Sequence, residues 1–266
     1  MGLEWITSRE NPRVKEYGKL NTGKQARKKL GMFTLEGTKL CIEAVQSGVS
    51  VVYALVTESW VGAHPELLQM LLQRGVSCYG ISEAIESKIS GTGGPQGVFC
   101  VCRLLESASL EQLKRMKKIL CLYDLQDPGN LGAMFRNADA LGFEAVVLSK
   151  ASCDLFSPKV LRSAMGSVFH LPYYIAEDMF LFEAEMSQSG LISAAAVVRD
   201  ANLIADGCNL PAIHLLYIGN EGNGLSAAFA VRCRYRITLA MKGKAESLNA
   251  AMAAGLLMWE LSKQEG

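Results

Sequence analysis

Hydrophobic positions in this chain come in short apolar runs separated by longer amphipathic stretches. Between residues 32 and 103 the pattern predicts strands at Met32–Leu35, Val51–Val56, Val76–Ile81 and Val98–Arg103, and helices from Thr38 to near Gly48, at Pro65–Gln73 and around Ala84–Lys88. Strands that alternate with helices of this length are typical of βαβ units. We therefore expect an α/β fold with a mainly parallel sheet.

The second half repeats the alternation with stronger signals. Strands are predicted at Ile119–Leu125, Ala145–Leu148, Leu191–Val198, His214–Ile218 and Tyr235–Met241, and helices at Met134–Leu141, from Pro158 to about Val168, at Phe180–Ser187, after Ser226 and from Ser247. Residues 104–117 form a charged stretch that we expect to be a helical connector. The predicted division is a first domain at 1–103, a linker at 104–117 and a second domain at 118–266.

Composition supports a folded chain, and its charge is uneven. Half of the 266 residues are hydrophobic and the net charge is +1, which excludes a largely disordered or wholly polybasic protein. Residues 1–30, however, carry eight basic side chains against three acidic ones. Such a run is often a solvated helix face, but its concentration here favours contacts with RNA phosphates. The candidates for these contacts are Arg9, Arg13, Lys24, Arg27, Lys28 and Lys29.

Membrane, export and metal functions find no support in the sequence. The most apolar stretch, Leu248–Trp259, is too short to span a bilayer, and the first residues lack the apolar run of a signal peptide. Eight cysteines without a C-x-x-C pair and three scattered histidines predict neither a disulfide scaffold nor a metal site. We expect reduced thiols, no metal and a cytoplasmic location.

Three polar segments of the second domain each follow a predicted strand, where ligand sites form in open α/β sheets. They are Asp127–Gly132 with the helix bearing Arg136 and Asn137, the glycine-rich Gly219–Ser226, and Met241–Asn249. Each taken alone could be an ordinary turn or a capped helix start. The glycine loop also lacks the spacing of a P-loop or a dinucleotide-binding fold.

Taken together, these segments resemble the three signature motifs of the SpoU/TrmH branch of the SPOUT methyltransferases, which methylate ribose 2′-hydroxyls of RNA. The first domain resembles the ribosomal-protein-like RNA-binding extension of that family through residues 8–12, 24–29, 33–37 and 95–97. Two departures are Asn137 where threonine is usual and Ala240 where proline often precedes the methionine.

The resemblance implies a SPOUT domain with a deep trefoil knot that binds S-adenosylmethionine. By position, the cofactor contacts are Gly219, Asn220, Gly222, Leu239, Met241, Leu248 and Asn249. The catalytic set is Arg136, Asn130, Glu221, Ser247 and Asn249. In the family the arginine activates the hydroxyl. Because a guanidinium with a pKa above ~12 is a poor base, stabilisation of developing charge or a grip on the neighbouring phosphate is an equally good role for it.

The same resemblance implies binding partners for this protein. It implies a homodimer whose interface completes the site, and the apolar spacing along Leu248–Trp259 supports one independently. Ribosomal RNA, with 23S rRNA favoured, is the expected substrate, and transfer RNA is the alternative. Two other classes stay open: a non-catalytic RNA-binding or ribosome-assembly protein on the same fold, and an enzyme that uses another nucleotide cofactor.

Overall fold

The computed structural model describes residues 3–205 and 210–263, which form two compact units. The first unit extends to Glu106 and also contains Asp154–Phe169. The second comprises Ser107–Cys153 and the chain from His170 onward. The sequence-based division assigns 154–169 to the second domain, whereas in the structure this segment packs with the first.

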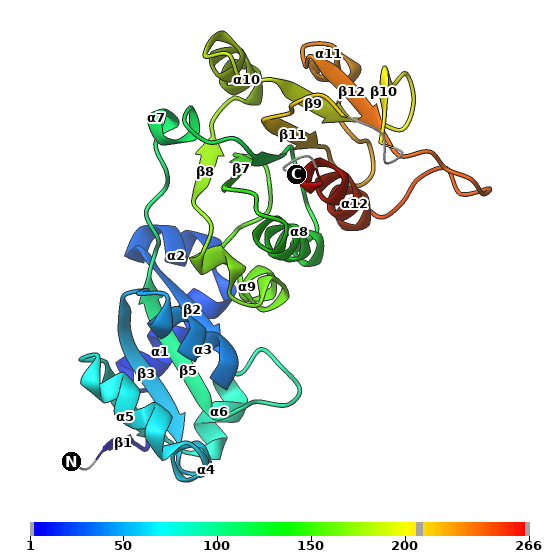
Figure 1. Cartoon of the computed structure of the whole chain (residues 1–266). Helices are drawn as coiled ribbons and strands as arrows, with labels where there is room; N and C mark the ends of the chain where they lie inside the picture. The colour runs from blue at the N-terminus through cyan, green and yellow to red at the C-terminus, as the bar shows by residue number, and fades with distance from the viewer. Residues whose placement is uncertain (1–2, 206–209, 264–266) are drawn as a thin grey trace. The chain divides into compact units, whose positions relative to one another are not determined.

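The first unit is a five-stranded mixed sheet with helices around it (Figure 1). Its strands are β1 (Glu4–Ile6), β2 (Met32–Glu36), β3 (Val51–Thr57), β4 (Ser77–Ile81) and β5 (Val98–Arg103), in the order β1-β4-β3-β5-β2. Its helices are α1 (Pro12–Thr22), α2 (Lys24–Leu30), α3 (Thr38–Gln46), α4 (Glu58–Ala63), α5 (Pro65–Gln73), α6 (Glu83–Ile89) and α9 (Pro158–Ala164). Because β5 pairs antiparallel with both β3 and β2, the expected mainly parallel sheet is mixed here.

The basic N-terminal segment is part of this core. Val14, Tyr17 and Leu20 of α1 are buried against the sheet, and Arg27 of α2 is buried as well. Residues 154–169 join the unit through Phe156 and Phe169, whose rings lie 5.1 and 6.3 Å from that of Phe33. These contacts connect far-separated parts of the sequence, which periodicity alone does not reveal.

The second unit is built on a seven-stranded parallel sheet, as the apolar runs predict. Its strands are β6 (Ile119–Leu122), β7 (Ala145–Ser149), β8 (Tyr173–Ala176), β9 (Ser193–Ala196), β10 (Leu203–Ile204), β11 (Leu215–Ile218) and β12 (Tyr235–Thr238). The order is β10-β12-β9-β11-β6-β7-β8, and every pair is parallel. Its helices are α7 (Leu110–Leu113), α8 (Pro128–Ala140), α10 (Met179–Gln188), α11 (Ala227–Ala230) and α12 (Ala250–Ser262).

Several element boundaries differ from the expectation. The connector 104–117 contains only one helical turn, α7, and α8 begins six residues earlier than predicted, at Pro128. Asp127 caps α8 by accepting the Asn130 N–H at 2.9 Å, and proline at the first helical position suits a helix start. The segment taken for a chain breaker is therefore a helix N-terminus.

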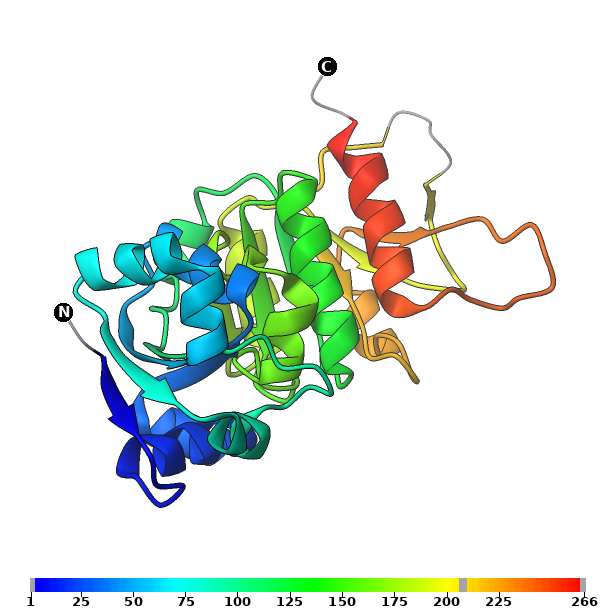
Figure 2. The same cartoon turned by 90° about the horizontal axis from the view of Figure 1, so that it is seen from below.

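Helices α8 and α12 pack side by side (Figure 2). Gly255 makes this packing close, because a Cβ there would lie 2.9 Å from Nδ2 of Asn137. The Asn137 side chain also donates to the Ala251 carbonyl at 3.4 Å. The asparagine that departs from the family pattern thus joins the two helices that follow the first and third motifs.

Candidate functional site

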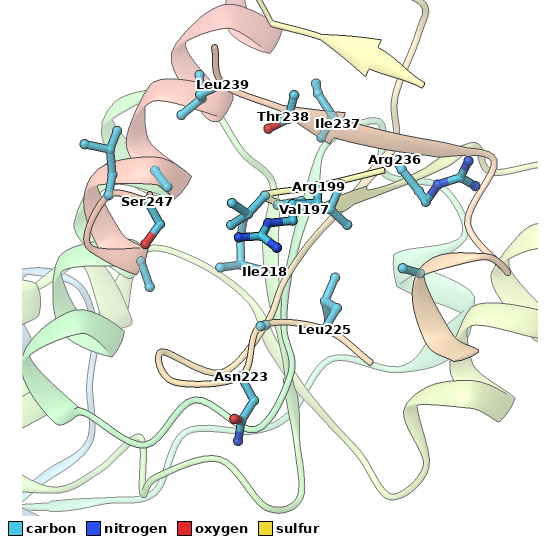
Figure 3. Close-up of a pocket in the computed structure, with 18 of the residues that line it drawn as sticks. Val197, Arg199, Ile218, Asn223, Leu225, Arg236, Ile237, Thr238, Leu239 and Ser247 are labelled. Carbon is cyan, nitrogen blue, oxygen red and sulfur yellow. The ribbon is translucent and has the colours of Figure 1, made fainter. Parts of the chain in front are cut away.

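A cavity of about 840 Å³ opens at the carboxyl edge of the parallel sheet. Its walls come from residues 196–200 at the end of β9, 218–225 at the end of β11, and 236–239, 241 and 246–248 around the end of β12 and the approach to α12 (Figure 3). Since β12, β9 and β11 are neighbours in the sheet, their carboxyl ends bring these segments together. Ile218, Leu239 and Leu248 give the cavity apolar walls beside a polar loop.

The glycine-rich loop that lines this cavity is folded tightly on itself. A Cβ on Gly219 would lie 2.2 Å from the backbone carbon of Gly224, so no other residue fits there without moving the chain. The Oδ1 atom of Asn220 accepts the N–H groups of Gly222 at 2.9 Å and Asn223 at 3.2 Å. Its Nδ2 donates to the Asp124 carbonyl at 2.9 Å, which ties the loop to the segment after β6.

A hydrogen-bond network joins the three motifs beside the cavity. Oε1 of Glu221 accepts the Asp127 N–H at 2.9 Å and Nδ2 of Asn130 at 3.2 Å, and Oε2 accepts the Gln126 N–H at 3.1 Å. Oδ1 of Asn130 accepts Nδ2 of Asn249 at 3.1 Å. Asn249 also caps α12 by accepting the Ala251 and Met252 N–H groups. One carboxylate and two amides thus hold the starts of two helices and the glycine loop together.

The network favours the ionised form of Glu221. Partial burial raises the pKa of this carboxyl, but the N–H groups of Gln126 and Asp127 and the Asn130 amide outweigh that effect, so the net pKa lies below the usual 4.5. The carboxylate is therefore charged at neutral pH, with hydrogen bonds on both oxygens.

The structure brings most of the sequence-predicted site residues together. Gly219, Asn220, Glu221, Gly222, Leu239, Met241, Ser247 and Leu248 line the large cavity. Asn130, Asn249 and Glu221 border an adjoining shallow hollow, which shares Asn220 and Gly222 with the cavity. Asn249 lines this hollow rather than the large cavity.

Arg136 lies apart from this group. It is exposed on α8 and is not among the described residues that line the cavity or the hollow. Within the described residues, the Arg136 side chain makes no hydrogen bond or ion pair.

Sequence reasoning missed two arginines of the cavity. Arg199 and Arg236 both line it, and both side chains are labelled in Figure 3. The Arg236 side chain donates through Nε to the Asp200 carbonyl at 2.8 Å. Arg199 follows β9, so its place becomes evident only once β9 is known to lie between β11 and β12.

The six predicted RNA contacts differ in their surroundings. Arg9, Lys24, Lys28 and Lys29 are exposed. The Arg13 guanidinium lies 4.0 Å over the Tyr79 ring and also donates to its hydroxyl at 2.7 Å. Arg27 corrects the expectation: it is 5% exposed, and its Nε and Nη2 donate to Oδ2 of Asp154 at 2.8 and 2.7 Å. Since this guanidinium is buried and paired, it serves the fold and is not available to phosphate.

Within residues 3–205 and 210–263, no cluster of three or more His, Cys, Asp or Glu side chains could hold a metal ion. No helix of the same part of the chain has the length and apolarity needed to cross a membrane.

Comparison with known proteins places this geometry in a family. Residues 117–259 match the SpoU rRNA Methylase family, and residues 11–100 match the MRM3-like substrate binding domain. The chain is 34% identical over 259 residues to the 23S rRNA (guanosine(2553)-2′-O)-methyltransferase RlmP of Bacillus subtilis (strain 168), covering 97% of this chain and 99% of that protein.

Two solved structures are similar over nearly the whole chain. An AdoMet-bound rRNA methyltransferase from Sinorhizobium meliloti superposes with a TM-score of 0.85 at 25% identity, covering 99% of both chains. The SpoU methyltransferase AviRb from Streptomyces viridochromogenes, in complex with the cofactor AdoMet, gives 0.81 at 26% identity, covering 96% of this chain and 98% of that one. With both of its parts matched and the three motifs joined by one hydrogen-bond network, the chain belongs to the SpoU rRNA methylase family.

Proposed function

We propose that the protein transfers a methyl group from S-adenosylmethionine to a ribose 2′-hydroxyl of RNA. The observation that carries this proposal is the Glu221–Asn130–Asn249 network, which holds all three motifs beside the cavity. The similarity to the B. subtilis 2′-O-methyltransferase over nearly the full chain supports the same reaction.

The cavity residues fit this cofactor. Gly219 leaves backbone uncovered where a side chain would collide, and the apolar walls at Ile218, Leu239 and Leu248 suit an adenine ring. Gly219, Leu239 and Leu248 would hold the cofactor, with Asn220 and Glu221 shaping the loop. When bound, it supplies a methyl group already attached to a good leaving group.

The chain's own residues then position the hydroxyl and stabilise charge. Both ends of the Asn130 amide are engaged, by Glu221 and by Asn249, so we assign Asn130 and Glu221 to positioning. Ser247 lines the cavity just before α12 and would contact the ribose or the cofactor. Arg136 would bind the hydroxyl oxygen as its negative charge develops, or the adjacent phosphate.

We further propose a homodimer in which Arg136 reaches the cavity of the partner subunit. Arg136 does not line the cavity of its own chain, which supports a role for it in a second copy. Helix α12 also presents an apolar face, on which Met252, Leu256 and Trp259 are 57%, 40% and 52% exposed. Such a face is costly in water and suits a two-fold interface.

For the substrate we propose ribosomal RNA, with 23S rRNA first, in the cytoplasm. The match of residues 11–100 to a substrate-binding domain and the specificity of the B. subtilis relative support this choice. Transfer RNA is the alternative that the mapping experiment below can reveal.

We also infer a trefoil knot in the second unit. The glycine loop and the segment leading to α12 both line the same cavity, which supports a threaded C-terminal segment. A crystal structure with the chain traced continuously from Ala205 to Ser262 tests this inference.

Two measurements test the function. Binding titrations should show affinity for S-adenosylmethionine and none for NAD or ATP. Mapping of 2′-O-methyl sites in total RNA from cells with and without the gene should reveal one or more lost sites in ribosomal RNA. Binding of another nucleotide would contradict the cofactor. Unchanged maps would favour a non-catalytic RNA-binding role.

A further inference from the structure

A second cavity, of about 240 Å³, lies wholly within the first unit. It is bordered by the end of β2, the start of α3, the loop after α6 and the end of α9 (Figure 1). Its volume is below the roughly 300–1,000 Å³ of sites for drug-sized ligands, so its occupant is small. The methyl-transfer site described above uses none of its residues.

A buried carboxylate builds the loop side of this cavity. Glu36 is 7% exposed, and its Oε1 accepts the hydroxyls of Ser90 and Thr92 at 2.5 and 2.8 Å. Its Oε2 accepts the Gly91 N–H at 2.9 Å. At the other end of the loop, Oε1 of Gln96 accepts the Thr38 N–H at 2.9 Å. The loop is therefore held in place by hydrogen bonds to side chains.

Arg162 of α9 supplies an unused donor. It lines the cavity, and its Nη1 is buried without a hydrogen-bond partner among the residues that the structure describes. A buried charged donor left unpaired is costly, and a ligand that brings an acceptor removes that cost. Lys39 adds a second cation to the lining. The acceptor oxygens of Glu36 and Gln96 already have donors, so the cavity offers mainly donors to a ligand.

Met165 gives the rim an apolar surface in an unusual backbone conformation. It caps α9 with φ 53°, the left-handed region that non-glycine residues seldom adopt, and its side chain is 42% exposed. The next residue, Gly166, has no room for a side chain, because a Cβ there would lie 2.6 Å from Cγ of Glu43. Together with Leu40, the methionine offers a flat ligand an apolar contact beside the Arg162 donor.

We propose that this cavity binds the base of one unpaired nucleotide of the substrate RNA, with the base against Met165 and Leu40 and its acceptors toward Arg162. The proposal rests on the RNA-modifying function proposed above. Unpaired bases are recognised in this way, through stacking and hydrogen bonds to their exposed edges. Guanine fits best, because its O6 and N7 are adjacent acceptors for a guanidinium. The segment that carries Arg162 and Met165 falls within the methylase match, yet it packs with the substrate-binding unit.

The test compares the binding of two RNAs by the full-length protein. One probe is a hairpin with guanosine in an unpaired loop, and the other is a fully paired duplex of the same composition. Arg162→Gln and Met165→Gly should each weaken hairpin binding by about tenfold, the scale of one lost base contact, and leave duplex binding unchanged. Lys159→Gln, on the exposed surface of the same helix, is the matched control and should affect both RNAs equally.

Folding and function are monitored separately. Met165→Gly removes backbone strain, so an unchanged or higher melting temperature shows that weaker binding is not caused by unfolding. Equal loss for hairpin and duplex with Arg162→Gln would mean a simple phosphate contact and would overturn the proposal, as would no loss for either. If the wild type methylates RNA but both variants bind the hairpin normally, the base-binding inference is wrong and the proposed methyl transfer stands. If hairpin binding depends on Arg162 but the wild type transfers no methyl group, the proposed function is wrong and the base-binding inference stands.

A crosslinking experiment gives a second readout. A hairpin with 6-thioguanosine in its loop, irradiated with the wild-type protein, should crosslink to peptides from residues 90–97 or 158–166. Crosslinks confined to other peptides would contradict the assignment.

Discussion

At the residue scale, Arg136 is the side chain whose proposed role is easiest to separate from folding. Because it is exposed and unpaired within the described structure, Arg136→Ala should leave the melting temperature and the cofactor affinity unchanged. Turnover should fall by about 10²–10³, the usual effect of removing one group that stabilises developing charge. Single-turnover methyl transfer checks this prediction. Near-normal turnover would make Arg136 a surface charge without a catalytic role.

Lysine at position 136 tests whether the planar geometry of the guanidinium is required for catalysis. Arg136→Lys keeps the positive charge but loses the planar donor fork, so it should restore little activity. A lysine variant close to the wild-type rate would show that a general positive field is sufficient.

The protonation state of Glu221 should make cofactor binding depend on pH. Since folding lowers the pKa of this carboxyl, the ionised form stabilises the loop above the ordinary pKa near 4.5, and this stabilisation is lost as the pH falls through the lowered value. Cofactor binding by the wild type should therefore weaken on the acid side of 4.5. Glu221→Gln should bind weakly already at neutral pH and depend less on acid. Calorimetric titrations of both proteins across this range test the prediction, and parallel pH profiles would contradict it.

At the element scale, the conformation of the loop after β11 requires a residue without a side chain at position 219. Gly219→Ala would place a methyl group 2.2 Å from the Gly224 backbone carbon, so the loop must move out of its position in the cavity. We expect at least a tenfold loss of cofactor affinity with an intact second domain. Equilibrium dialysis measures the loss. Gly243→Ala, in open space on the segment before α12, is the control and should bind normally.

The basic residues of helix α2 have two different roles, one in stability and one in RNA binding, which the sequence pattern does not distinguish. Arg27→Met should lower the free energy of unfolding by about 3–5 kcal/mol, because it leaves Asp154 without its buried partner. Charge reversal of the exposed Lys24, Lys28 and Lys29 should leave stability nearly unchanged. It should weaken RNA binding, with the slope of log affinity against log salt falling by roughly 0.7–0.9 for each lost phosphate contact.

Urea unfolding and salt titrations of RNA affinity, applied to both sets of variants, separate the two roles. A stable Arg27→Met protein would contradict the structural role of Arg27. An unchanged salt slope in the charge-reversed protein would move the RNA surface away from α2.

At the scale of the whole molecule, the proposed dimer allows a complementation test. At a cofactor concentration too low to fill the weakened Gly219→Ala site, Arg136→Ala and Gly219→Ala should each be nearly inactive alone. If the arginine serves the partner's cavity, random mixing of subunits gives heterodimers with one complete site, and activity should recover to about a quarter of wild type. Rates before and after mixing and refolding measure this. Without recovery, the arginine would act in its own chain or not at all.

Much of the architecture was predictable from local pattern. Strands such as Val98–Arg103 and helices such as Pro65–Gln73 have the predicted bounds, because side-chain periodicity and breakers act over a few residues. The errors are also physical: the Asp-Pro-Gly-Asn sequence supplies both a helix cap and a turn, and only the packing of α8 selects the cap. The three motifs were identifiable because each lies directly after a strand.

What the sequence by itself determined is thus the type and place of most elements and the residues of the three motifs. The tertiary structure decided the rest: that β9 lies between β11 and β12 and brings Arg199 into the cavity, that Arg27 is buried against Asp154, and that residues 154–169 pack with the first unit. The physical reason is that periodicity reports contacts between near neighbours in the chain. Strand order, burial of charge and domain membership depend instead on contacts between residues far apart in sequence, for which a local pattern carries no signal.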